Sequence, residues 1–312
     1  MHKVLISSPY FQPEVERFRA VFEKHDIEPI VPEVRERLSE MELLALPEIS
    51  EIEGIIAGDD EITLPVLDAA KKLKMVSKWG TGTDSMKEAC AERGIPVRNM
   101  PNAFTLPVAD SVMGYVLAFA RRQPWMDQAV KAGVWEKLPG RSLSECSIGV
   151  IGVGNCGKAV LRRAAAFGMK LYATDIRQIE PDFIAEHRVE MLPLAGMLSR
   201  SDFVSVNCDL NPMSRHIICA RTIGFMRQSA VLINTARGPL VNESDLITAL
   251  LDERIAGAAL DVFEHEPLPL ASPLRTMSNV MLAPHNANSS PAAWERVHQS
   301  TLKNLLEFFP EP

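Results

Sequence analysis

Residues 148–175 read IGVIGVGNCGKAVLRRAAAFGMKLYATD and constrain the fold more tightly than any other part of the chain. An apolar segment typical of a β-strand leads into Gly152-x-Gly154-x-x-Gly157, a helix-like segment follows, and a second apolar strand ends at Asp175. Three glycines alone are a weak signal, but this strand–turn–helix–strand context makes them specific. The first glycine allows the tight turn, the second lets the backbone approach a pyrophosphate, and the third lets the helix pack close to the strand.

This unit predicts a dinucleotide site. The helix N-terminus offers unpaired N–H groups and the positive end of a dipole to the phosphates. Asp175 can accept hydrogen bonds from a ribose diol and would repel a 2′-phosphate, which favours NAD over NADP. Arg177 lies two residues on and partly offsets that repulsion, so the expected preference is moderate. The alternative is a plain βαβ unit whose glycines serve only packing, and an acidic residue at the expected place argues against it.

The composition excludes several classes of protein. The chain has 312 residues, 46% of them hydrophobic and 23% charged, which is ordinary for a globular protein of about two domains. The net charge of −7 argues against a nucleic-acid-binding surface. The sequence contains no apolar run long enough for a membrane span, and its first residues do not resemble a signal peptide.

The positions of the cysteines indicate a reducing compartment, and those of the histidines give no reason to expect a metal site. The cysteines are scattered and form no CxxC pair, which is typical of a reducing compartment; they are Cys90, Cys146, Cys156, Cys208 and Cys219. We therefore expect a cytoplasmic protein. The histidines lack ligand spacing with cysteines or carboxylates, so no metal site is expected.

Short apolar strands alternate with amphipathic helices along the whole chain, which predicts parallel sheets covered by helices. The first series has strands at 4–8, 54–58 and 75–80 and helices near 13–25, 63–72 and 84–92. The second has strands near 147–151, 170–174, 202–206, 230–234, 256–260 and 279–282. Turn residues at 99–102 mark a boundary, and a long apolar helix follows at 103–122. The pattern does not assign the last helix, near 291–309, to either sheet.

Polar residues follow three predicted strands, in the segments 232–240, 259–267 and 281–286. Open α/β sheets bind their ligands at the carboxyl ends of the strands. The arginine of the first segment is suited to hold a planar carboxylate through two parallel hydrogen bonds. A histidine with a nearby carboxylate provides a proton donor that titrates near neutrality. Together with a nicotinamide site, these groups suggest hydride transfer at a carbon next to a carboxylate.

The chain resembles the D-isomer-specific 2-hydroxyacid dehydrogenases, closest to the D-3-phosphoglycerate dehydrogenase branch. The resemblance covers almost the whole chain and rests on the glycine unit ending at Asp175 and on four further motifs. These are KWGTGTDS (78–85), NTARGPLVNESDLITAL (234–250), GAALDVFEHEP (257–267) and APH (283–285). Together they are far more specific than any one of them.

The resemblance implies two doubly wound, Rossmann-like α/β domains. Residues 1–99 plus 285–312 would form a flavodoxin-like substrate domain, and residues 100–284 would form an inserted NAD-binding domain. The cleft between them would close on the substrate and exclude water. Because the chain ends at Pro312, the resemblance is to a short form without the C-terminal regulatory domain.

The resemblance also assigns roles to single residues. Arg237 would hold the substrate carboxylate and the reacting oxygen, and His285 would be the general acid/base. Glu266 would hydrogen-bond that histidine and raise its basicity; we favour it over the neighbouring Glu264 and His265 because it precedes Pro267, the family's position for the acid. Each of the three roles has a purely structural alternative. Arg237 would then cap a neighbouring helix, His285 would be a hydrogen-bonded histidine between the domains, and Glu266 would be a surface acid.

On the substrate side, the backbone N–H groups of Thr81 and Gly82 would cradle the carboxylate. Lys78 stands where related phosphoglycerate enzymes often carry arginine, so it would contact a distal phosphate or a polar tail. A solvated lysine at a strand end is an equally good interpretation.

The cofactor would contact Gly152, Gly154, Asn155, Cys156, Gly157, Asp175, Cys208, Thr235, Ala236 and Asp261. Asn155 replaces an arginine common in relatives. Cys156 lies in the first helical turn, where a thiol pKa can fall, so its oxidation could block cofactor binding; we favour a small packing residue instead. Asp261 is either structural or a contact on the nicotinamide side. Asn288 places a polar side chain near the reacting centre where relatives have a small-residue turn.

The sequence therefore predicts an NAD-dependent D-2-hydroxyacid dehydrogenase with a small 2-hydroxy or 2-oxo acid as substrate, 3-phosphoglycerate being one candidate. The alternatives are a glyoxylate/hydroxypyruvate reductase and, less favoured, a nicotinamide-sensing scaffold resembling corepressor relatives. Trp125, Val134 and Trp135 lie among polar residues in the connecting stretch 123–142. Aromatic residues there suggest a homodimer interface, and the alternative is that both tryptophans fold back on their own domain.

Overall fold

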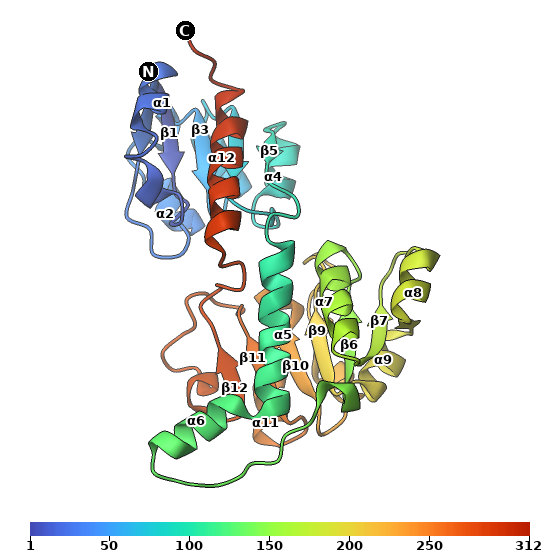
Figure 1. The fold of residues 1–312 in the computed structure, drawn as a ribbon. Coiled ribbons are helices and arrows are strands. Elements are labelled where there is room, and N and C mark those ends of the chain that lie inside the picture. The colour runs from blue at the N-terminus through green and yellow to red at the C-terminus, as the bar shows by residue number, and fades with distance from the viewer. The chain divides into compact units, whose positions relative to one another are not determined.

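The computed structural model describes residues 1–312, which divide into two compact units (Figure 1). Unit 1 comprises Met1–Phe104 and Ser290–Pro312, and unit 2 comprises Thr105–Ser289. Each unit is a parallel sheet covered by helices, so the predicted fold class is confirmed. No helix combines the length and the apolar character that crossing a bilayer requires.

Unit 1 contains a five-stranded sheet in the order β2-β1-β3-β4-β5, and every neighbouring pair is parallel. Its strands are β1 (His2–Ile6), β2 (Ile27–Ile30), β3 (Gly54–Ala57), β4 (Met75–Lys78) and β5 (Val97–Arg98). This order is that of the flavodoxin-like doubly wound sheet.

Five α-helices surround this sheet: α1 (Arg19–Lys24), α2 (Glu40–Leu44), α3 (Leu64–Ala69), α4 (Lys87–Glu92) and α12 (Pro291–Leu306). Two short 3-10 helices, Gln12–Glu14 and Ile49–Glu51, lie in the connections. The last helix, α12, packs against β3 and β4, so the final segment returns to the first sheet (Figure 1).

Unit 2 contains a seven-stranded parallel sheet in the order β12-β11-β10-β9-β6-β7-β8. The strands are β6 (Ser147–Ile151), β7 (Lys170–Thr174), β8 (Glu190–Met191), β9 (Phe203–Val206), β10 (Val231–Asn234), β11 (Gly257–Leu260) and β12 (Val280–Leu282). Counted from β6, the order begins 3-2-1-4-5-6, the arrangement of dinucleotide-binding sheets. The strand order reverses between β6 and β9, and ligands of such sheets bind at that point.

The helices of unit 2 are α5 (Thr105–Arg121), α6 (Gln123–Lys131), α7 (Asn155–Ala166), α8 (Pro181–His187), α9 (Leu194–Arg200), α10 (Ala220–Ile223) and α11 (Glu243–Leu251). The 3-10 helices are Leu143–Glu145, Gly238–Leu240 and Pro273–Thr276. Ile148 and Val150 of β6 belong to an apolar cluster that α5 and α7 complete. Ile151 belongs to a second cluster, completed by α9 and α11. Both faces are therefore buried, as parallel strands require.

The structure differs from the sequence-based expectations at the sheet edges and in helices α1, α2 and α6, the last of which lies in the expected connecting stretch 123–142. Strands β2, β5 and β8 were not predicted, and β5 and β8 have only two residues each, too few to show a periodic pattern. The helix expected near 13–25 is shorter, because only residues 19–24 are α-helical. Helix α2 was not predicted; it is fixed by a capping box between Ser39 and Glu42.

Candidate active site in unit 2

The glycine turn joins β6 to α7 at the reversal of strand order. Gly152 has φ +89°, and a Cβ on it would lie 2.7 Å from the Cα of Cys208. A Cβ on Gly157 would lie 2.1 Å from the carbonyl oxygen of Gly152. Both positions therefore require glycine. Gly154 caps α7, and a Cβ there would meet only the Nη2 of Arg177, at 3.7 Å, so the space beside this helix terminus is open.

Asp175 follows β7 directly and carries a stabilised negative charge. Its Oδ2 accepts the N–H of Val153 at 2.6 Å, and its Oδ1 accepts the N–H of Arg177 at 2.8 Å. The Nε of Arg177 also lies 3.3 Å from Oδ1. Burial opposes ionisation, but the two backbone N–H groups and the guanidinium outweigh it, and the pKa of Asp175 is lowered. A ribose diol would meet an ionised acceptor here.

Burial disfavours the thiolate form of both cysteines of this region. Burial raises the pKa of Cys156 to about 11, and the same cause raises the pKa of Cys208 to about 11. The Cys156 thiol donates to Oδ1 of Asn207 at 3.6 Å. Burial outweighs the helix N-terminus, which favours the packing interpretation of Cys156 over a reactive thiolate.

Further polar groups line the carboxyl end of the sheet. Thr235 Oγ1 and Asn288 Oδ1 are buried and have no hydrogen-bond partner. Buried polar atoms without partners are rare in folded proteins, so such atoms indicate a ligand. The amide N–H of Ala236 donates to Oδ1 of Asn234 at 3.1 Å and turns the chain away from β10. With the open space at Gly154, these residues fit a bound dinucleotide.

Arg237 begins the loop after β10. Its carbonyl oxygen accepts the side-chain N–H of Asn234 at 2.8 Å, and its Nη1 donates to the carbonyl of Ala236 at 2.9 Å. The buried Asn234 thereby fixes the backbone that carries the guanidinium. The 3-10 helix Gly238–Leu240 follows at once.

Glu266 and His285 form a directly bonded pair. The His285 Nδ1 lies 2.9 Å from Glu266 Oε2, and the two side chains are 19% and 13% exposed. Glu266 Oε1 accepts the N–H of Phe263 at 2.9 Å, which fixes the carboxylate on its own loop. The neighbouring Glu264 does not contact this histidine and instead lies 2.7 Å from His216. Because Nδ1 faces a carboxylate, the imidazole is held in one orientation, with Nε2 on the opposite side of the ring.

Asp261 anchors the turn that carries His285. It follows β11, is 1% exposed, and accepts the N–H groups of Asn286 at 2.8 Å and Ala287 at 2.9 Å. The His285 N–H donates to the Asp261 carbonyl at 2.8 Å, and His285 has φ +52°. A non-glycine residue held in the left-handed region needs support from its surroundings. Burial raises the pKa of Asp261 despite the two N–H donors. The structural role that the sequence left open for Asp261 is thus observed, although the sequence did not show which groups it holds.

The predicted substrate residues Lys78, Thr81 and Gly82 belong to unit 1. Lys78 is only 4% exposed; its Nζ donates to the carbonyl of Trp79 at 2.8 Å and lies 3.3 Å from Asp59 Oδ1. This lysine is therefore not the solvated strand-end residue of the alternative interpretation. Thr81 donates through Oγ1 to the carbonyl of Met100 at 3.1 Å, which holds the loop after β4.

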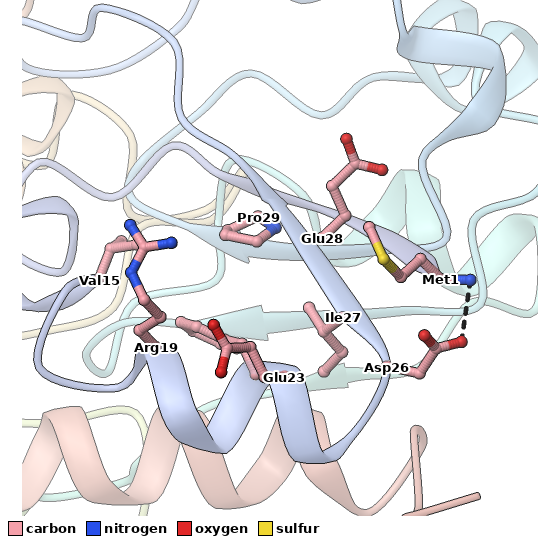
Figure 2. Close-up of a pocket in the computed structure, with 9 residues that line it drawn as sticks. Met1, Val15, Arg19, Glu23, Asp26, Ile27, Glu28 and Pro29 are labelled. Atoms are coloured by element: carbon pink, nitrogen blue, oxygen red, sulfur yellow. Dashed lines mark ion pairs between the residues drawn. The ribbon is translucent and has the colours of Figure 1, made fainter.

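A hollow of about 410 Å³ lies in unit 1 beside α1 and the edge strand β2. Figure 2 shows the N-terminal ammonium of Met1 pairing with Asp26, at 2.9 Å. Glu23 and Glu28 add two more carboxyl groups, against the single guanidinium of Arg19. The hollow contains none of the predicted site residues, and its acidic lining does not suit a carboxylate substrate.

Comparisons with known proteins identify the family of the chain. Residues 113–287 match the model of the D-isomer specific 2-hydroxyacid dehydrogenase NAD binding domain. A glyoxylate reductase from Korarchaeum cryptofilum is 39% identical over 80% of this chain and 77% of its own length. A D-3-phosphoglycerate dehydrogenase from Methanocaldococcus jannaschii is 35% identical over 94% of this chain, which spans only 55% of that relative. The crystal structure of D-lactate dehydrogenase from Aquifex aeolicus, complexed with NAD and lactic acid, superposes with a TM-score of 0.88 at 25% identity, covering 98% of this chain and 95% of that one.

The chain belongs to the D-isomer-specific 2-hydroxyacid dehydrogenase family. It is an NAD-dependent oxidoreductase, and unit 2 contains the NAD-binding region.

Proposed function

We propose that the chain transfers a hydride between NAD and a small D-2-hydroxy acid or its 2-oxo acid, with the chemistry carried by Arg237, Glu266 and His285. The 2.9 Å contact between His285 and Glu266 carries this proposal. It supports a histidine of fixed orientation in the same unit as the glycine turn. We further propose that unit 1 is the substrate domain and unit 2 the NAD-binding domain.

Bound NAD supplies a nicotinamide ring that takes up or returns the hydride. In the oxidation direction, His285 would take the hydroxyl proton through Nε2 as the hydride leaves the same carbon. Glu266 would hold the ring through Nδ1 and stabilise the imidazolium that forms. Arg237 would grip the carboxylate through parallel N–H bonds. Thr81 and Gly82 stay predicted contributors of backbone N–H groups.

We favour an unphosphorylated acid, such as glyoxylate or hydroxypyruvate, over 3-phosphoglycerate. Lys78 is the residue predicted to contact a distal phosphate, and its charge is balanced by Asp59, with the buried Asp60 also close enough to interact. To turn to a phosphate, this buried ammonium would have to give up both Asp59 and the Trp79 carbonyl. This pairing favours a substrate without a second anionic group.

The test follows NADH absorbance with glyoxylate, hydroxypyruvate and phosphohydroxypyruvate. The first two are expected to be reduced faster than the third. His285→Ala is expected to lose about 10²- to 10⁴-fold in kcat, the usual contribution of a positioned acid/base, while NADH still binds. A scaffold that only senses nicotinamide would bind NADH and reduce none of the acids. Near-normal turnover by His285→Ala would refute the assigned role.

We also propose a homodimer that uses the stretch after α6. Trp135 is 85% exposed, and Val134 beside it is 48% exposed. Trp125 instead folds back on unit 2, where its Nε1 donates to the carbonyl of Ser278 at 2.7 Å. Large exposed aromatic residues mark contact surfaces. Light scattering of wild type and Trp135→Ser tests this, and a wild-type monomer would count against it. The cytoplasmic location expected from the cysteine pattern stays a prediction.

A further inference from the structure

Two loops of unit 2 carry two of the three proposed catalytic groups, and they touch each other. One loop follows β10 and begins with Arg237; the other runs from Phe263 to Glu266. A Cβ on Gly238 would lie 1.8 Å from the carbonyl oxygen of Phe263, so only glycine permits this approach. The loop bearing Arg237 and the loop bearing Glu266 are therefore in direct contact at Gly238 and Phe263.

A histidine outside both loops joins them. The backbone N–H of His216 donates to the carbonyl of Pro239 at 2.9 Å, two residues after Arg237. Its ring Nε2 lies 2.7 Å from Oε1 of Glu264, two residues before Glu266. His216 thus contacts both loops, each within two residues of a proposed catalytic group.

Two further features fix this connection. His216 has φ +53°, a left-handed conformation that a non-glycine residue adopts only when its surroundings hold it. The N–H of Glu264 is 3.3 Å from Oε2 of Glu243, the first residue of α11, so the loop is tied from a second side. His216 and Glu264 are 33% and 26% exposed, which limits the screening of their pairing by water.

We infer that His216 is a positioning residue that sets the spacing between Arg237 and the Glu266–His285 pair. The inference rests on the proposed function. His216 contacts the loops that bear the reacting groups, and its effect reaches the substrate only through them. The ring holds Glu264, Glu264 fixes the loop, and the loop presents Glu266 to His285.

The experiment measures kcat, KM for the 2-oxo acid and NADH affinity in His216→Ala. Small displacements of catalytic groups can cost up to about 100-fold in rate, and we expect kcat to fall roughly tenfold, with a higher KM for the acid. NADH affinity should not change, because the glycine turn and Asp175 are untouched. The acidic limb of the pH profile for hydroxy-acid oxidation should move to lower pH, since a loosened Glu266 stabilises the His285 imidazolium less.

His216→Gln should recover most of the rate, because its amide can still donate to Glu264. His187→Ala is the matched control, a histidine of the same unit that contacts Phe183 and lies outside both loops. It should leave kcat, KM and the pH profile unchanged. If His216→Ala does not fold, Glu264→Ala is measured by the same criteria.

Two results would overturn the inference. The first is wild-type kcat, KM and pH profile in both His216→Ala and Glu264→Ala. The second is a parallel loss of NADH affinity and rate, which indicates general damage to the unit. Failure of the proposed function can be told apart from failure of this inference. In that case His285→Ala would keep its activity, whatever the result for the His216 variants.

Discussion

Asp60 in unit 1 and Asp261 in unit 2 are built alike. Each lies within three residues of a strand's carboxyl end and is at most 1% exposed. Burial raises the pKa of Asp60 and of Asp261. Asp60 accepts the Ser7 hydroxyl at 2.6 Å and the N–H groups of Leu38 and Gly58 at 2.8 and 2.9 Å. Asp261 accepts two N–H groups from the residues after His285.

The difference lies in what each carboxyl group holds. Asp60 ties together loops whose nearby cation, Lys78, is already paired with Asp59. Asp261 holds the turn on which His285 adopts its left-handed conformation and meets Glu266. The same buried group thus stabilises the scaffold in one sheet and a proposed acid/base residue in the other. A buried carboxyl group at a strand end is therefore not by itself a sign of a functional site. What matters is whether the loop that it holds carries a functional residue.

The largest expected effects separate the two cations at these sheet edges. Arg237→Ala should lower kcat/KM by about 100-fold or more, because a hydrogen bond to a charged group contributes about 1.5–3 kcal/mol and the proposed grip on the substrate carboxylate has two of them. Its unfolding free energy should change little. Lys78→Met should instead lower the unfolding free energy by about 1–3 kcal/mol, since it removes the cation beside Asp59 and leaves the Trp79 carbonyl without its donor. Steady-state kinetics and urea unfolding of both variants measure this contrast.

Phosphohydroxypyruvate tests the same contrast from the substrate side. If Lys78→Met raises KM for this acid alone and unfolds like wild type, Lys78 is a phosphate contact and the preference for unphosphorylated acids is wrong. Lys74→Met is the matched control. The Lys74 side chain is 51% exposed, and its Nζ pairs with Glu53. It should alter neither property.

Alanine variants of the two aspartates should differ in activity but not in stability. Asp60→Ala should destabilise the protein by about 1–3 kcal/mol for each donor left unpaired, with near-normal kcat in the folded enzyme. Asp261→Ala should cost comparable stability and also lower kcat about tenfold, because the turn bearing His285 is released. Equal kcat values in the two variants would contradict the anchoring role.

The pH dependence of stability has a definite sign for this pair. Both folded-state pKa values are raised above the ordinary 3.8. Their stabilising contribution is fully present below that value and is lost as the pH rises through the raised pKa. The unfolding free energy of wild type minus that of Asp60→Ala should therefore fall as the pH is raised from that value, because the subtraction cancels the carboxyl groups whose pKa is lowered, such as Asp175.

Much of this fold could be predicted because its signals are local. The central strands are apolar runs, and the glycine turn has a fixed spacing, so β6, β7 and β9 to β12 lie within one residue of their predicted bounds. Strands β5 and β8 have two residues each, and pairing with a neighbour, which sequence does not show, defines them.

In the candidate site, too, some residues could be predicted from local motifs and others could not. Arg237, Glu266 and His285 stand in recognisable motifs that follow strands. His216 lies in a loop without periodicity, and the approach of Gly238 to Phe263 joins residues far apart in the chain. The sequence left a structural role open for Asp261 but could not identify its partners, because these are backbone N–H groups, which every sequence provides.

The smallest expected effect concerns a third pairing of cation and carboxylate. Arg177 is 67% exposed where Lys78 is buried, so its guanidinium can leave Asp175 at little cost. A 2′-phosphate would meet both the Asp175 charge and a mobile guanidinium able to bind it. Arg177→Ala should therefore weaken NADPH binding about tenfold, the loss of one charge-assisted hydrogen bond, and change NADH binding less than threefold. Nucleotide fluorescence titrations measure both constants. Equal weakening of NADH and NADPH binding would mean that Arg177 contacts the pyrophosphate, which both nucleotides have. Arg177 would then not bind the 2′-phosphate.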